Sequence, residues 1–559
     1  MSVRMATIPT LDRFSALAQA MNPPPLSFCE RASAACRDGA IGDSIGDSSR
    51  DSSRARGVRP LPPIHPLRAL LWRGARGAGP LLLAAAGLGT VAGCANYAGI
   101  HSDKQPLDVT QVATAQSLPA QGGQWPTMGW ASSVGDAQLA GLIDEALANN
   151  PSLAEARARL ERASAYAAGA DARRYPRVNG QYSVKRELYS GNALYPEPYG
   201  GNWYTENNAA LSASYELDLW GKNSAGLAQA ISEERASAAE EQESRLSLAT
   251  SVAQQYNALA REYALLDVAQ AEARERQALG KISGARFSAG LDTQVETRVS
   301  DTQIATSNTL ISQLQGSITV MRYQLGALLG KGPDRGLAIA RPQLPALGAS
   351  ALPDSVPANL LSRRPDIVAA RWRVDAATQG VKVGKAEFYP DINLSAAAGF
   401  DAFGFGHFLQ FGSRQIQAGP AIDLPIFDAG ALRARLKDRY ATFDTAVATY
   451  NDTLVRSLTE VATQIAQIRS TEQQQHDAQG AYDAAAKAYQ LAVIRYRGGL
   501  STQLQVLDAD RSLLQQRQTL VTLEAQRRDQ QIGLIKALGG GFTSDDRPNM
   551  TSNKNRSTR

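Results

Sequence analysis

Hydrophobic residues recur every three or four positions over two very long stretches of this 559-residue chain. The first stretch runs from Lys222 to about Arg286 without a proline, and the second, from Ala431 to about Arg497, has the same character. At 1.5 Å per residue, each stretch predicts a helix of roughly 100 Å. Because the apolar positions keep a seven-residue spacing, the pattern predicts helices packed side by side as in coiled coils.

Shorter stretches alternate apolar and polar residues with a period of two, which is typical of strands that have one apolar face. Two such strands are expected in each half of the chain, at about 177–188, 208–219, 391–401 and 415–425. Two strands per half cannot close a barrel within one chain. Amphipathic strands that face lipid need a closed sheet, so the pattern predicts that several chains contribute strands.

The order of the elements occurs twice. "NNPSLAEARARLERASAYAAGADARRYP", residues 149–176, and "RRPDIVAARWRVDAATQGVKVGKAEFYP", residues 363–390, both have a proline near the start and Tyr-Pro at the end. Proline is tolerated in the first turn of a helix, and the residue before a proline resists helical geometry. Each half therefore predicts helix, strand, loop, strand, long helix, bend and returning helix, and we interpret the chain as a tandem duplication.

The bend itself is also repeated. "RFSAGLDTQVETRV" from Arg286 and "RYRGGLSTQLQVLD" from Arg495 both place Gly-Leu-x-Thr between two helical patterns. Gly290 and Gly499 would allow the chain to turn, and the Thr or Ser that follows each glycine could cap the returning helix.

A targeting segment precedes these repeats. Arginines followed by "GPLLLAAAGLGTVAGC" have the basic start, apolar middle and small-residue end of a secretory signal, and the run is too short for a mature membrane helix. Its "VAGC" resembles the bacterial lipobox, in which cleavage leaves a lipid-carrying cysteine, here Cys94; the alternative is a cysteine in an ordinary signal peptide. Cys29 and Cys36 lie upstream, so the mature chain would contain no disulfide.

The expected domains follow from these signals. They are a disordered or wrongly assigned N-terminal extension (1–67), a lipoprotein signal peptide (68–93), a lipidated linker (94–124), a first repeat (125–330), an inter-repeat linker (331–357), a second repeat (358–541) and a disordered tail (542–559).

Charge and chemistry exclude several function classes. Residues 1–93 contain 11 Arg and 6 acidic residues, so removing them from the chain totals of 58 basic and 53 acidic leaves 47 of each. This balance argues against a nucleic-acid partner. The histidines His101, His407 and His476 are scattered, and "GALLGKG" lacks the spacing of a phosphate loop. We therefore expect no enzyme activity, no metal and no cofactor apart from the lipid on Cys94.

From about Trp125 to Gly541 the chain resembles the TolC-like outer membrane factors of tripartite efflux pumps, within them the lipid-anchored branch. The resemblance rests on "VAGC", the two Pro…Tyr-Pro segments, "YELDLWGK", "LPIFDAGALRA" and the paired bends. It implies a mainly α fold with membrane strands: a homotrimer in which four strands from each protomer form a 12-stranded barrel in the outer membrane. The long helices would continue this barrel as an α-helical tunnel in the periplasm of a Gram-negative bacterium.

The resemblance also implies sites. The bends would form the periplasmic tip, where an adaptor protein docks, through Arg286, Gly290, Leu291, Thr293, Arg495, Tyr496, Gly499, Leu500 and Thr502. Leu504 and Asp508 match a constriction in which an apolar plug adjoins a cation-attracting ring. The alternatives are a packed seam position for Leu504 and a solvated helix aspartate for Asp508. Gln505 stands where some members have a second acidic residue, and Ser501 where some have a basic one.

The resulting functional hypothesis is a passive exit duct for drug-like or toxic small molecules. An adaptor protein and an inner-membrane pump would be its partners, and outer membrane lipid would surround its barrel. One alternative is an outer membrane channel for type I protein secretion. The other is a periplasmic coiled-coil scaffold or adaptor without a pore, which would explain the heptads but not the four amphipathic strands.

Overall fold

The computed structural model describes residues 96–544, except 120, 193–195, 349–352 and 354–355. The N-terminal extension, the signal peptide, Cys94 and most of the C-terminal tail lie outside the described residues. Among the residues that are described, none of the helices combines the length and the apolar character needed to cross a membrane.

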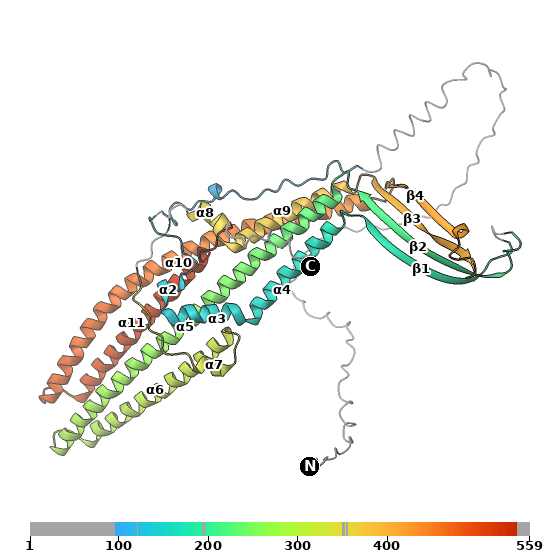
Figure 1. Cartoon of the computed structure of the whole chain (residues 1–559). Coiled ribbons are helices and arrows are strands. Elements are labelled where there is room, and N and C mark those ends of the chain that lie inside the picture. The colour runs from blue at the N-terminus through green and yellow to red at the C-terminus, as the bar shows by residue number, and fades with distance from the viewer. Residues whose placement is uncertain (1–95, 120, 193–195, 349–352, 354–355, 545–559) are drawn as a thin grey trace, which may run out of the picture. The chain divides into compact units, whose positions relative to one another are not determined.

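The two long helices that the hydrophobic spacing predicts are present, and each is followed by a shorter helix that runs back along it (Figure 1). The pairs have equal lengths: α5 and α10 contain 67 residues each, and α6 and α11 contain 35 each. The larger helices are α3 (Ala137–Asn149), α4 (Pro151–Ala172), α5 (Lys222–Ser288), α6 (Gln294–Leu328), α9 (Pro365–Ala386), α10 (Ala431–Arg497) and α11 (Gln503–Ala537).

Short helical segments complete the structure. They are η1 (Val109–Gln111), α2 (Ala131–Val134), α7 (Pro333–Leu337), α8 (Val356–Arg363) and η2 (Phe411–Ser413). The segment expected to link the repeats thus contains α7 and the start of α8. A Cβ on Gly336 of α7 would lie 1.9 Å from the backbone oxygen of Arg322 in α6. Only glycine fits this close approach, so α7 packs tightly against α6.

Proline and glycine mark the helix boundaries as expected. Pro151 begins α4 directly after Asn150, whose side chain accepts a hydrogen bond from the Ser152 amide, and Pro365 begins α9. Gly221 and Gly430 precede the long helices with positive φ angles of 72° and 89°. Such angles disfavour residues with a Cβ, so these glycines allow the chain to turn from sheet to helix.

The strands β1 (Arg177–Leu188), β2 (Trp203–Leu217), β3 (Asp391–Phe403) and β4 (Arg414–Asp423) form one antiparallel sheet in the order β1-β2-β3-β4 (Figure 1). β2 begins at Trp203, earlier than the alternation suggests, because Trp203 pairs with Leu188 at the far end of β1. It ends at Leu217, since the Asp218 carboxylate accepts hydrogen bonds from the Asn223 and Ser224 amides and so caps α5.

The register gives the sheet one apolar and one polar face. Neighbouring strands place apolar residues opposite one another on the first face: Val178, Tyr182, Val184, Leu211, Ala213, Tyr215, Leu394, Ala396, Ala398, Ile416, Ala418 and Ile422. The other face carries Asn179, Gln181, Ser183, Lys185, Ser212, Ser214, Glu216, Asn393, Ser395, Gln415, Gln417 and Asp423. Within the described part of the chain, β1 and β4 each pair on one side only.

The core is distributed along the helix seams. In the first half, Val252, Tyr256 and Leu259 of α5 are fully buried against α3 and α6, and the Tyr256 hydroxyl donates to the Asp136 carboxylate at 2.9 Å. In the second half, Leu454 and Val461 of α10 are equally buried. The heptad positions are therefore the packing positions, as the sequence predicts.

Candidate functional site

The two bends have the same backbone geometry. Gly290 and Gly499 adopt φ angles of 71° and 74°. The amide of the following leucine donates back to the helix that has just ended, from Leu291 to Arg286 O at 2.9 Å and from Leu500 to Arg495 O at 2.8 Å. This arrangement is a glycine-dependent helix C-cap, and it confirms the turning role expected of both glycines.

The caps that follow the glycines differ. Thr293 and Glu296 form a capping box at the start of α6, in which the Thr293 amide donates to the Glu296 carboxylate at 2.8 Å. Thr502 occupies the equivalent position before α11, but its side chain makes no capping hydrogen bond. The expectation of a capping side chain is thus correct for the first bend and wrong for Thr502; the second returning helix has the neutral Gln505 at the third helical position, where the first has Glu296.

A cluster of hydrogen bonds joins the bends to each other. The Asp292 carboxylate accepts from Arg286 Nε at 3.0 Å, from Arg286 Nη2 at 3.1 Å and from the Tyr496 hydroxyl at 2.5 Å. Arg286 Nη1 also donates to Tyr496 O at 3.1 Å, and its guanidinium lies over the Tyr496 ring. Hydrogen bonds from Arg286 keep the pKa of Asp292 below its ordinary range. We call these three residues the tip tether.

Beneath the tip tether, a buried polar layer connects three helices. Gln503 Nε2 donates to Ser283 Oγ of α5 at 2.9 Å and to Ser300 Oγ of α6 at 2.7 Å. Ser283 also contacts the Tyr496 hydroxyl at 3.1 Å. Sequence analysis selected Arg286 and Tyr496 but missed Asp292, Gln503 and the serines. Small polar residues at seam positions were the available signal.

The remaining expected docking residues lie on the outside of the bends. Leu291 and Leu500 are 65% and 74% exposed, and Thr293, Arg495 and Thr502 are also exposed. Two large apolar side chains at the ends of otherwise polar helices form a surface that a partner protein could cover.

The two expected constriction residues lie one turn apart on α11. Leu504 is 65% exposed and so is not packed among the described residues of this chain, and Asp508 is exposed on the same side. Both line a cavity of about 430 Å³ together with Arg276, Leu310 and Asp510. The structure thus brings Leu504 and Asp508 to one surface.

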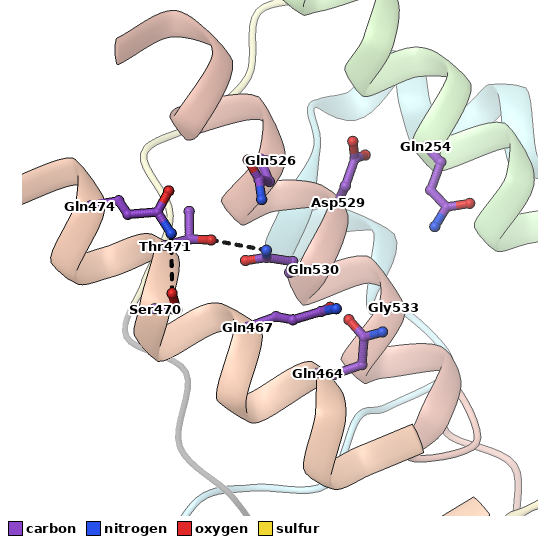
Figure 2. A pocket seen from close by; sticks show the side chains of 10 residues that line it. All are labelled: Gln254, Gln464, Gln467, Ser470, Thr471, Gln474, Gln526, Asp529, Gln530 and Gly533. Atoms are coloured by element: carbon purple, nitrogen blue, oxygen red, sulfur yellow. Dashed lines mark hydrogen bonds between the residues drawn. The ribbon is translucent and has the colours of Figure 1, made fainter. Parts of the chain in front are cut away.

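Farther from the bends, α10, α11 and α5 line an open pocket of about 390 Å³ that is rich in amides (Figure 2). Its walls are formed by Gln254, Gln464, Gln467, Ser470, Thr471, Gln474, Gln526, Asp529, Gln530 and Gly533. Gln530 Nε2 donates to Thr471 Oγ1 at 2.9 Å, and a Cβ at Gly533 would lie 2.7 Å from Gln464 Oε1. Burial raises the pKa of Asp529. The chemistry of this pocket is hydrogen bonding with little fixed charge.

Comparison with known proteins agrees with this geometry. A family model described as outer membrane efflux protein matches residues 142–331 and 356–540. The fusaric acid resistance protein FusA of Burkholderia cepacia is 36% identical over 353 residues, which cover 62% of this chain and 66% of that protein. The multidrug resistance outer membrane protein MdtP of Escherichia coli K12 is 30% identical over 81% of this chain and 94% of its own length.

Solved structures show the same fold. The outer membrane protein VceC of Vibrio cholerae superposes with a TM-score of 0.71 at 36% identity, covering 75% of this chain and all of that one. The outer-membrane channel OprN gives a TM-score of 0.71 at 26% identity, over 79% and 97% of the two chains. Since the family model covers both repeats, including both bends, the chain belongs to the outer membrane efflux protein family.

Proposed function

We propose that three copies of this chain form a passive exit duct in the outer membrane, supplied by an inner-membrane pump through a periplasmic adaptor protein. The open amphipathic sheet carries the proposal. Among the described residues, the edge strands β1 and β4 have no partner on their outer sides, and the apolar face of the sheet is largely exposed. Pairing β4 of one copy with β1 of the next would satisfy both edges, and three copies would close a barrel of 12 strands with the polar face inside.

The helices would continue this duct into the periplasm. Their seams hold each pair together, while Gln, Ser and Thr cover much of the remaining surface, as in the pocket of Figure 2. A lining of neutral amides offers hydrogen bonds without strong charge selection, which suits a duct whose pump chooses the cargo. The proposed cargo is drug-like or toxic small molecules, and the names of the relatives, multidrug resistance and fusaric acid resistance, support this class.

The bends would form the tip that the adaptor protein contacts, with Leu291 and Leu500 as its apolar anchors. In the resting tip, the tip tether would hold the two helix pairs of each protomer together. Three copies of Leu504 and Asp508 around the axis would narrow the duct and favour cations. Adaptor binding would open this constriction, and the chain would carry out no chemistry of its own.

A lipid on Cys94 would add a second anchor to the membrane. The described chain begins two residues later and runs along α10, where Arg433 Nη2 donates to Ala98 O at 3.3 Å and the Ser102 hydroxyl contacts Asp444. Tyr97 and Ile100 pack with Phe388 and Leu432, at the junction of helices and sheet. The N-terminal segment would thus hold the lipid near the start of α10, which follows β4 in the chain.

Of the alternatives, a scaffold without a pore leaves the sheet unexplained, whereas a type I secretion channel shares the fold and differs in cargo. The decisive measurement is single-channel conductance in a planar bilayer, comparing wild type with Asp508→Ala. A small, cation-selective conductance that grows and loses selectivity in the variant would support the duct and the constriction. Equal conductance in the two proteins would show that Asp508 does not form the constriction. A folded preparation without any conductance would refute the proposal that the protein is a duct.

A further inference from the structure

Two buried carboxyl groups face each other between the two helix pairs. Glu272 lies on α5 of the first pair and Asp510 on α11 of the second, and both residues are 2% exposed. Oxygens of Glu272, Glu275 and Asp510 lie within 4.8 Å of one another. Among the described residues, no hydrogen-bond partner reaches either carboxyl oxygen of Glu272 or Oδ1 of Asp510. Buried carboxylates so close together repel each other unless something positive lies between them.

Two arginines neutralise part of this charge. Arg276 Nε lies 2.8 Å from Glu272 Oε1, and Arg276 Nη2 lies 3.2 Å from Asp510 Oδ2. Arg517 contacts Glu275 through both terminal nitrogens at 3.2 Å and approaches Glu272 Oε2 at 3.9 Å. Three carboxylates therefore share two guanidinium groups, which leaves one negative charge uncompensated in a cluster where Glu272 and Asp510 are buried and Glu275 is partly exposed.

Within the described ranges, the other groups around the cluster do not supply the missing positive charge. On α10, burial raises the pKa of Tyr489 to about 12, and the nearby carboxylates contribute to this rise. Tyr482, also on α10, lies beside Arg517. From α6, Ser307 Oγ and Gln303 O accept from Arg276 Nη1 at 3.1 and 3.4 Å. On α11, Asp508 and Arg511 line the neighbouring cavity as an acidic and a basic residue. The neutral contacts from α6 and α10 leave the balance unchanged.

A single proton would neutralise the one uncompensated negative charge. A divalent cation would instead leave the cluster with a net positive charge, and it would be repelled by the two neighbouring guanidinium groups. Burial, aided by the nearby Asp510, raises the pKa of Glu272 to about 8. A protonated Glu272 can donate to the Asp510 carboxylate, which turns a repulsive pair into a hydrogen bond across α5 and α11.

We propose that Glu272 and Asp510 form a proton-dependent latch that fastens α5 to α11, and that loss of the shared proton loosens the helix pairs and favours opening of the tip. The proposal rests on the channel function proposed above. Separating the two helices would expose Glu272 to water and return it to its ordinary acidity, so opening releases a proton. Rising pH therefore favours the open state until Glu272 is already ionised in the closed state.

The direction and range of the effect follow from this linkage. The folded pKa of Glu272, about 8, lies above the ordinary value of 4.5, so the latch is strongest in acid and weakens as pH rises between these values. Each latch should raise the open-to-closed ratio by up to about tenfold per pH unit in this range. Above about pH 8 the ratio should level off.

The test is single-channel open probability of the full trimer in planar bilayers from pH 6 to 9, with and without EDTA. Wild type should show a rise that levels off near pH 8, whereas Glu272→Gln, which mimics the protonated form, should show no such rise. Asp301→Asn, which removes an exposed carboxylate on α6, is the matched control and should keep the wild-type curve. Asp510→Asn should flatten the curve as well, and it substitutes for Glu272→Gln if that variant fails to form trimers.

The outcomes separate the latch from the channel. A folded wild type that conducts equally at every pH overturns the latch and leaves the channel intact. If the pH response survives in Glu272→Gln, a proton on Glu272 is not the group that holds the helices together. If EDTA abolishes the response, a metal ion rather than a proton holds them together. A folded trimer that conducts at no pH would overturn the channel function itself.

Discussion

Tyr496→Phe tests whether the tip tether holds the two helix pairs together. The Tyr496 ring is 1% exposed, and its hydroxyl donates to the Asp292 carboxylate at 2.5 Å while contacting Ser283 Oγ at 3.1 Å. Phenylalanine keeps the ring, its packing against Leu279 and Val506, and its contact with the Arg286 guanidinium. The substitution therefore removes the charge-assisted hydrogen bond to Asp292 and the weaker contact with Ser283, while the packing of the ring is kept.

The size of the effect follows from that bond. A hydrogen bond to a charged group contributes about 1.5–3 kcal/mol. If the three protomers of the proposed trimer open together, the variant should shift the equilibrium by about 4–9 kcal/mol, or roughly a thousandfold or more, toward the open state. The shift is this large only if Asp292 and Tyr496 separate when the tip opens.

The assay is single-channel open probability at neutral pH, with Tyr323→Phe as the control, since Tyr323 is 41% exposed on α6. The control should behave as wild type, and Tyr496→Phe should spend much more time open. An open probability that stays at the wild-type level, in a trimer of normal thermal stability, would show that the tether survives opening and would refute this reasoning.

Three further results are expected. Gly499→Ala should lower the free energy of unfolding of the detergent-solubilised protein by about 1–2 kcal/mol in denaturant, because Gly499 has a φ of 74°. The adjacent Gly498→Ala, at a φ of −77°, should have a much smaller effect. Equal losses in the two variants would contradict this backbone argument. Arg364→Ala should cost about 1.5–3 kcal/mol, because it removes charge-assisted hydrogen bonds to the partly exposed carboxylates of Asp366 and Glu460, and thermal denaturation should show this loss. Cys94→Ser should remove the acyl mass from the mature protein in mass spectrometry, unless the lipobox assignment is wrong.

Local sequence signals were sufficient for most of the architecture. Heptad spacing found the seams of α5 and α10, alternation found the four strands, and the proline and glycine positions found the ends of α4 and α9. These features depend on residues near each other in the chain, where backbone geometry and periodicity dominate. Because the chain is duplicated, each of these sequence signals occurs once in each half, so one half supports the prediction made for the other.

The tip tether and the latch could not be found in this way. Asp292 and Tyr496 are 204 positions apart in the sequence. Glu272 and Asp510 likewise come from different repeats. Each of these contacts depends on how two long helices are rotated about their axes. A partial signal existed, since Asp510 occupies a seam position between Val506 and Leu513, where a charged residue requires a buried partner. Its partner's identity still required the fold.

The unequal caps of the two bends have a mechanical consequence. The pairs α5–α6 and α10–α11 have equal lengths, so a force applied at the two bends loads both pairs equally. The first bend is stiffened by the capping box of Thr293 and Glu296, whereas the second lacks a side-chain cap at Thr502. Under an equal load, the second bend should therefore fray first, and a duplicated chain would yield along one of its two halves rather than symmetrically.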